Sequence, residues 1–317
     1  MKKKFLVTGG TGFIGSAICR KLVKENDLVV IDNNQRGFSR RLESIKDKIT
    51  FHKADIRDQS SLLKFSKGVD CIIHAAYVNG TENFYVKPKE IVDIAIKGMI
   101  NVLHACEVNS IKEIVLLSSS EVYQHAKLIP TPEEIPLIIP DIKNPRFSYG
   151  GGKIACELML MSYCKENFKK AIIIRPHNVY GIDMGWEHAI PQLISKINIS
   201  KNNNEEHIQI QGTGSETRAF IHIEDFIEAF DLVLKKSKHL DIINIGNDRE
   251  IKIIELVKIL KKLIGFNGKI KKGKLKEGST LRRCPDIGKL KNYGFKPNIK
   301  LEKSLYEIID WYIKNQK

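Results

Sequence analysis

A tyrosine and a lysine four residues apart are the residues of this sequence best suited to proton transfer. Tyr149 and Lys153 lead into a stretch whose apolar spacing predicts a helix over residues 154–167. Positions four apart share one helix face, and an ammonium beside a phenol lowers the pKa of the phenol. A tyrosine so placed can exchange protons near neutral pH. The pair alone is equally consistent with two surface side chains, so the choice depends on its surroundings.

A second group of polar residues follows a predicted strand. The apolar run 113–117 indicates a buried strand, and Ser118, Ser119, Ser120 and Glu121 come directly after it. In a doubly wound sheet the carboxyl ends of the strands face the ligand crevice. The hydroxyls and the carboxylate would then be well placed for chemistry, although serines at a strand end are also common turn formers.

Three glycines near the N-terminus predict a phosphate-binding turn. A short apolar run at residues 5–7 leads into Gly9, Gly12 and Gly15, and residues 17–23 have the apolar spacing of an amphipathic helix. The glycines permit a tight turn, a close approach of backbone to a pyrophosphate, and close packing of helix on strand. The amides at the helix N-terminus attract the phosphates. We therefore interpret this segment as a dinucleotide site.

An acidic residue ends the next predicted strand. Residues 28–31 are apolar, and Asp32 follows them, about 20 residues beyond the glycine turn, where a carboxylate binds a ribose 2′-hydroxyl. Arg36, Arg40 and Arg41 come soon after, and arginines in this place can bind the 2′-phosphate of NADP instead. Because the charge of Asp32 would repel that phosphate, the sequence favours NAD.

Strands and helices continue to alternate along the first part of the chain. This alternation is typical of a Rossmann-like, doubly wound parallel sheet in the α/β class. We expect an NAD-binding domain over residues 1–181 and a smaller C-terminal α/β substrate-binding domain over 182–317, with some later segments returning to the first domain. The further elements predicted are strands at 49–54, 69–76 and 171–174, a helix at 89–107, a proline-rich surface loop at 129–145 and a C-terminal helix at 301–313 that packs on the core.

The composition excludes several classes of protein. No apolar run approaches the roughly 20 residues that cross a bilayer, and the short apolar run after the N-terminal lysines ends too soon for a targeting signal. We expect a cytoplasmic protein with no membrane partner. Its net charge of +15 comes from dispersed lysines, which favours solubility and attraction for anionic ligands over nucleic-acid binding. The six cysteines have no paired metal spacing, so we expect buried thiols and no metal.

Taken together, these motifs resemble the extended short-chain dehydrogenase/reductases, and specifically the NAD-dependent nucleotide-sugar epimerase and dehydratase family. The resemblance runs from Thr8 to Tyr312, and the combination is specific although each motif alone is not. The matching segments are the glycine motif at 8–15, Ser119 ahead of Val122 and Tyr123, the Tyr149/Lys153 pair, and the segments 175–181, 217–225 and 282–286.

The resemblance implies a mechanism. Ionised Tyr149 would act as general base on a sugar hydroxyl, commonly at C4, while Ser119 hydrogen-bonds the same oxygen and a hydride passes to NAD. Lys153 would bind the nicotinamide ribose and depress the pKa of Tyr149. The implied catalytic residues are Ser119, Tyr149, Lys153 and Glu121. The implied cofactor-binding residues are Gly9, Gly12, Phe13, Ile14, Gly15, Asp32, Asn33, Asp55, Ile56, Ala75, Tyr149 and Lys153. The implied substrate-binding residues are Ser119, Ser120, Asn178, Arg218 and one or both of Arg282 and Arg283.

Departures from the family pattern leave the catalytic groups intact. Gln124 replaces the usual glycine after Tyr123, Gly152 replaces a serine, and Ile182 replaces a proline. The pair Ser120–Glu121 is the best discriminator of reaction type. Dehydratases of the deoxythymidine type carry Asp-Glu there, whereas GDP-mannose dehydratases, UDP-glucuronate decarboxylases, many epimerases and 4-dehydrogenases carry Ser-Glu.

We therefore rank C4 oxidation, ending in epimerisation or in release of the 4-keto sugar, above dehydration or decarboxylation. A UDP-hexose or a GDP-heptose would be a plausible substrate. The Lys-, Ile- and Asn-rich composition suggests an AT-rich bacterial source, in which such enzymes often serve capsule or lipopolysaccharide sugars. A non-catalytic NAD-binding protein is the alternative from another class. In this family the helices that match residues 89–107 and 154–167 form a four-helix interface, so we expect a homodimer.

Overall fold

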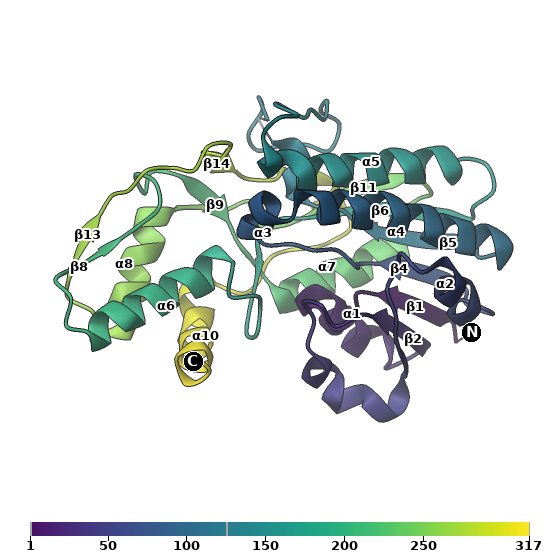
Figure 1. Cartoon of the computed structure of the whole chain (residues 1–317), viewed down its shortest axis with the longest axis horizontal. Coiled ribbons are helices and arrows are strands. Elements are labelled where there is room, and N and C mark those ends of the chain that lie inside the picture. The colour runs from purple at the N-terminus through teal and green to yellow at the C-terminus, as the bar shows by residue number, and fades with distance from the viewer. Residues whose placement is uncertain (1, 125, 317) are drawn as a thin grey trace.

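A seven-stranded parallel sheet with helices on both faces forms the larger part of the molecule (Figure 1). The computed structural model describes residues 2–124 and 126–316. The strand order is β11-β6-β5-β4-β1-β2-β3, so the chain reverses direction across the sheet between β1 and β4. Ligands bind at such a reversal, outside the carboxyl ends of the strands. The strands are β1 (Lys4–Thr8), β2 (Asp27–Asp32), β3 (Thr50–Lys53), β4 (Cys71–His74), β5 (Glu113–Leu117), β6 (Lys170–Pro176) and β11 (Asp241–Ile245).

In every strand of this sheet except edge strand β3, alternate residues enter two separate cores, because successive side chains of a strand point to opposite faces. In β1, Leu6 belongs to one core, while Phe5 and Val7 belong to the other. Burial on both faces explains why these strands are continuous apolar runs in the sequence. One core is covered by α2 (Gln59–Phe65), α4 (Pro88–Val108) and α5 (Ser148–Tyr163), and the other by α1 (Phe13–Leu22), α7 (Ile223–Lys236) and α9 (Gly288–Asn292).

A third core holds the C-terminal part together, on the left of Figure 1. Three helices contribute most of it, and short strand pairs close its edges. The chain leaves this part to form α7 and β11, so residues 223–245 lie against or within the large sheet. The elements are α6 (Ala189–Asn202), α8 (Ile253–Ile264) and α10 (Leu301–Lys314), with the pairs β7 (Val179–Tyr180) and β10 (Ile221–His222), β8 (His207–Gln209) and β13 (Lys269–Lys271), and the set β9 (Thr217–Ala219), β12 (Glu250–Lys252) and β14 (Arg282–Arg283).

The predicted fold class is confirmed, and two local predictions need correction. The helix expected over 154–167 is α5, which begins earlier, at Ser148, and ends at Tyr163; the segment 165–167 is a turn that returns the chain to β6. The polar loop after β2 runs into a 3₁₀ helix, η1 (Ser39–Lys48), which is anchored by buried Leu42 and Ile45. Three shorter helices lie near the strand ends: α3 (Thr81–Val86), η2 (Ser120–Tyr123) and η3 (Pro145–Phe147).

Some classes of site and element are missing from the part of the chain that the structure describes. Within residues 2–124 and 126–316, no helix is both long and apolar enough to cross a bilayer. The same residues contain no cluster of histidine, cysteine and acidic side chains that could hold a metal ion. All six cysteines are buried free thiols.

Candidate active site

The turn between β1 and α1 has no room for side chains at its glycines. Gly9 has a positive φ of 73°, and a Cβ there would lie 2.5 Å from the Cα of Ala76 at the end of β4. A Cβ on Gly15 would lie 2.1 Å from the carbonyl oxygen of Gly9. Gly12 is the N-cap of α1, and within the described residues no side chain caps this helix. Its first amides are therefore available to a phosphate.

A cleft with an empty volume of about 570 Å³ opens beside this turn. It is lined by Gly9, Gly12 and Asp32, and by Ala75 with its neighbours at the end of β4. Asp32 accepts hydrogen bonds from the backbone amides of Thr11, at 3.0 Å, and Asn34, at 2.8 Å. These bonds hold the carboxylate at the mouth of the turn, where the sequence places a ribose-binding acid.

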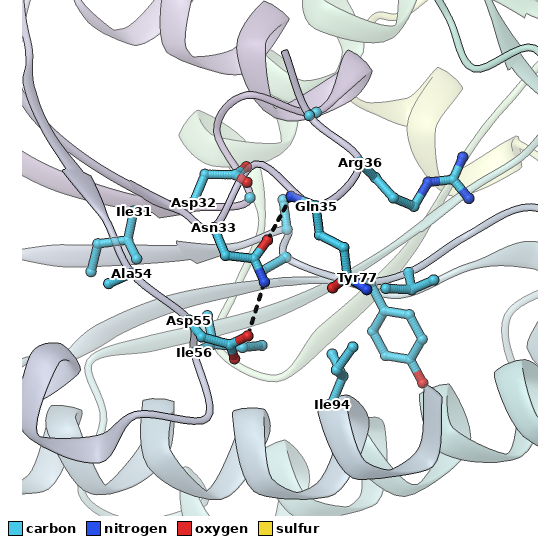
Figure 2. Close-up of a pocket in the computed structure, with 16 residues that line it drawn as sticks. Ile31, Asp32, Asn33, Gln35, Arg36, Ala54, Asp55, Ile56, Tyr77 and Ile94 are labelled. Carbon is cyan, nitrogen blue, oxygen red and sulfur yellow. Dashed lines mark hydrogen bonds between the residues drawn. The ribbon is translucent and has the colours of Figure 1, made fainter. Parts of the chain in front are cut away.

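Hydrogen bonds between polar side chains stabilise the part of the cleft that is predicted to contact the adenine ring. Figure 2 shows the side chain of Asn33 lying between Gln35 and Asp55. Asn33 donates to the Asp55 carboxylate at 2.9 Å and accepts from the Gln35 amide at 3.0 Å. Arg57 binds the same carboxylate and, more than any other group, lowers the pKa of Asp55 to about 2. Ile56 contributes an apolar wall.

The arginines that follow Asp32 are paired with acidic residues of the C-terminal part. Arg36 lies 3.0 Å from Glu187. Arg40 and Arg41 both bind Asp183, at 2.6 and 3.0 Å. Arg40 and Arg41 are thereby engaged by Asp183, whereas the buried Nη1 atom of Arg36 has no partner among residues 2–124 and 126–316. The preference for NAD over NADP therefore rests on Asp32.

Ser119 and Tyr149 lie together at the carboxyl end of β5. Their side chains are hydrogen-bonded, and both residues are buried. The ring of Phe84 stacks on Tyr149 at 4.7 Å, and the ring of Tyr77 meets it edge-on at 5.0 Å. Burial raises the pKa of Tyr149 to about 12, while the Ser119 hydrogen bond acts in the opposite direction.

Lys153 lies on the same helix as Tyr149, and its ammonium is directed toward β5. Its ammonium donates to the carbonyl oxygen of Leu117 at 2.6 Å and lies 4.0 Å from the ring centroid of Tyr77. Burial lowers the pKa of Lys153 to about 8. Helix spacing does put both residues on α5, but the long lysine side chain turns toward β5. The lowering of the Tyr149 pKa by Lys153 stays a prediction, because Lys153 is not among the groups that act most strongly on Tyr149 in this structure.

Glu121 is held between two arginines from distant parts of the chain. Arg146 binds the carboxylate at 3.0 Å and Arg283 binds it at 2.7 Å. Burial alone would raise the pKa of Glu121, but Arg283 and then Arg146 outweigh this effect and bring the pKa down to about 2. The side-chain amide of Gln124 donates a hydrogen bond to the backbone carbonyl of Glu121. The backbone of Gln124 has a positive φ of 25°.

The predicted substrate-binding residues do not line the cleft beside the glycine turn, and most of them have partners within the protein. Arg218 is tied to the backbone carbonyls of Thr217 and Thr280, and burial, followed by the charge of Arg283, lowers its pKa to about 10. Ser120 is buried at the start of η2. Asn178 donates to the carbonyl oxygen of Ala219 at 2.9 Å.

Arg282 does not join this group. Its exposed side chain turns outward and binds Glu250 at 2.6 Å, because successive residues of β14 point in opposite directions. Only Arg283 of the two neighbouring arginines reaches Glu121. Of the two arginines, Arg283 therefore fits the predicted substrate-binding role better, and the assignment of Arg282 stays a prediction.

Arg146 and Tyr77 are site residues that the sequence reasoning missed. Arg146 follows a proline-rich segment predicted to be a surface loop, yet it is buried against Glu121 and the ring of Phe84. Its position three residues before Tyr149 was the available signal, because the first turn of a helix that carries a catalytic group lies next to that group. Tyr77 follows the small residues at the end of β4 and covers Lys153.

A doubly wound sheet with a glycine-rich phosphate turn, an acidic residue for the ribose, and a Ser-Tyr pair at a strand end defines an NAD-dependent short-chain dehydrogenase/reductase. Residues 5–246 match the NAD-dependent epimerase/dehydratase family, to which the chain belongs. The predicted family, fold and cofactor are thereby confirmed. The residues that line the cleft suit NAD, which would lie along the glycine turn with its adenosine ribose at Asp32.

Several relatives cover nearly the whole chain. A putative UDP-glucose 4-epimerase of Methanocaldococcus jannaschii is 33% identical and covers 98% of this chain and 99% of its own. GDP-L-fucose synthase 1 of Arabidopsis thaliana is 29% identical, with 98% and 94% covered. The solved UDP-N-acetylglucosamine 4-epimerase of Methanobrevibacter ruminantium, in complex with UDP-N-acetylmuramic acid, has a TM-score of 0.87 at 28% identity and covers both chains completely. These relatives catalyse different reactions on nucleotide sugars, so they leave the reaction of this chain open.

Proposed function

We propose that this protein uses NAD to oxidise C4 of a nucleotide-diphosphate sugar. It then either returns the hydride to the opposite face, as a 4-epimerase, or releases the 4-keto sugar, as a 4-dehydrogenase. The observation that carries the proposal is the hydrogen-bonded pair Ser119 and Tyr149 beside the dinucleotide cleft. The 4-epimerases among the relatives support the same assignment.

Each residue has a defined part in this proposal. The sugar C4 hydroxyl lies at the Ser119–Tyr149 pair, Ser119 holds its oxygen, and Tyr149 accepts its proton. NAD, when bound, supplies the hydride acceptor. Nearby Arg283 and Arg36 favour the ionised form of Tyr149, as positive charges do for any phenol. Phe84 and Tyr77 exclude water from the reacting oxygen.

Dehydration is the less favoured reaction because of the state of Glu121. A dehydratase needs a base that removes the C5 proton of the 4-keto intermediate. Two arginines bind Glu121 and lower its pKa to about 2, so its carboxylate is a weak base near neutral pH. We place this activity in the synthesis of surface polysaccharides on the basis of the amino-acid composition alone.

The test is to incubate the purified, NAD-loaded protein with matched pairs of C4 epimers, such as UDP-glucose and UDP-galactose. Absorbance at 340 nm reports reduced cofactor, and mass spectrometry reports the product. We expect either interconversion of the epimers at unchanged mass or a product two mass units lighter with accumulation of NADH. A loss of one water from the product would refute the assignment in favour of dehydration.

A further inference from the structure

The cleft beside the glycine turn does not extend to the catalytic residues. The residues that line it run from the glycine turn to Tyr77 and its neighbours, and they do not include Ser119, Tyr149 or Lys153. These three residues are only 9%, 4% and 3% exposed. A dinucleotide whose adenosine lies at Asp32 can therefore reach them only after a side chain between them and the cleft has moved.

Tyr77 is the side chain that lies between the cleft and the catalytic residues. It lines the cleft, and the centroid of its ring lies 4.0 Å from the Lys153 ammonium and 5.0 Å from the ring centroid of Tyr149. Figure 2 shows its hydroxyl pointing away from Asn33 and the adenine end of the pocket. Tyr77 thus has the cleft on one side and two catalytic residues on the other.

The Tyr77 hydroxyl is held in this position by packing alone. It is buried and has no hydrogen-bond partner in the described part of the chain. It lies against Gly152, where a Cβ would be 2.4 Å from the hydroxyl oxygen, so the ring fits only because this position, a serine in the related family, is a glycine. A buried hydroxyl without a partner is unfavourable, and this favours a movement that brings it to solvent or to a ligand.

We propose that Tyr77 is a gate residue, which must turn aside before the nicotinamide half of NAD can lie beside Ser119 and Tyr149. The cation–π contact with Lys153 and the edge-on contact with Tyr149 stabilise the closed position. The apparent affinity for NAD therefore falls in proportion to the fraction of molecules that are open. The adenosine half binds at the other end of the cleft and needs no such movement. The inference concerns entry of the cofactor and does not depend on which sugar the protein oxidises.

The test compares NAD and NADH with ADP, which lacks the nicotinamide half. Stopped-flow fluorescence of NADH reports when the reduced nicotinamide is bound by nucleotide-free protein. We expect the observed rate to level off as the NADH concentration rises, because opening becomes limiting, and to rise in proportion in Tyr77→Ala. By calorimetry, Tyr77→Ala should bind NAD about fivefold or more tightly than the unmodified protein, with its affinity for ADP changed by less than about twofold. Tyr306→Ala, at an exposed position on α10, is the matched control and should change neither.

Gly152→Ser tests the same gate with the aromatic ring in place. Its Cβ would displace the Tyr77 hydroxyl, so it should remove the plateau in rate, whereas Tyr77→Phe, which keeps the ring beside Gly152, should retain it. A rate that rises in proportion to NADH concentration in the unmodified protein would refute the gate. Weaker binding of NAD to Tyr77→Ala would also refute it, because Tyr77 would then be a contact of the bound cofactor. The measurement on the unmodified protein decides the matter even if a variant does not fold.

Discussion

Glu121→Gln is the change whose consequence can be worked out most fully from the structure. The pKa of Glu121 is about 2, against an ordinary value of 4.5, and at about 1.4 kcal/mol per pKa unit the charged form contributes roughly 3 kcal/mol to stability. Removing one partner of a buried ion pair costs about 3–5 kcal/mol of stability, and the value from the pKa shift is of the same size. The pKa of Glu121 is lower in the folded state than in the unfolded state. The stabilisation by its charged form is therefore complete above pH 4.5 and is lost as the pH falls through about 2.

The assay is urea unfolding of the Glu121→Gln variant and the unmodified protein at pH 7 and pH 3, followed by tryptophan fluorescence. We expect a difference in unfolding free energy of about 3 kcal/mol at pH 7 and about half of that or less at pH 3. Glu166→Gln, at an exposed position, is the matched control and should change little at either pH. A difference below about 1 kcal/mol at pH 7, or one that does not shrink in acid, would refute the ion-pair account.

Four further outcomes follow from the same structure. Tyr149→Phe should still bind NAD, but its turnover should fall about a hundredfold or more. Ser119→Ala should reduce turnover less. Unchanged turnover in Tyr149→Phe would refute the mechanism in which Tyr149 is the base. Arg283→Gln should move the rising limb of the pH–rate profile to higher pH, because the guanidinium lowers the Tyr149 pKa. NAD should bind more tightly than NADP, since Asp32 lies at the ribose site, and equal affinity would contradict this. Leu158 is 67% exposed on α5, so Leu158→Glu should split the predicted homodimer in sedimentation experiments, whereas a monomeric unmodified protein would refute the dimer itself.

Local features of the sequence predicted most of the sheet and the cofactor side of the site. The strand at 113–117 is β5 residue for residue, and the helix predicted at 89–107 is α4 to within one residue at each end. The glycine turn and Asp32 form one motif close together in the chain, so periodicity and spacing suffice to find them. The geometry of the turn, including the close contact of Gly9 with β4, follows the pattern expected of a dinucleotide fold.

The substrate side could not be predicted in the same way, because its contacts join distant segments. Glu121 meets Arg283 across 162 residues of sequence and Arg146 across 25. Nothing in the local pattern distinguishes Arg283, which binds Glu121, from exposed Arg282, which binds Glu250; only the register of β14 does. The direction of the Lys153 side chain could not be predicted for a related reason. Helix periodicity fixes the position of a Cα atom, but a four-carbon side chain can reach several different partners from that position.

The two arginines on Glu121 also affect the catalytic tyrosine. Burial and, to a smaller extent, the charge of Glu121 raise the pKa of Tyr149, while Ser119, Arg36 and Arg283 lower it, and the net result is a pKa of about 12. A free carboxylate at this place would oppose the formation of the phenolate that C4 oxidation requires. Pairing the carboxylate with arginines removes most of that opposition and leaves net positive charge beside the phenol. This positive charge favours the ionised base, which is why proton transfer should respond when Arg283 is changed.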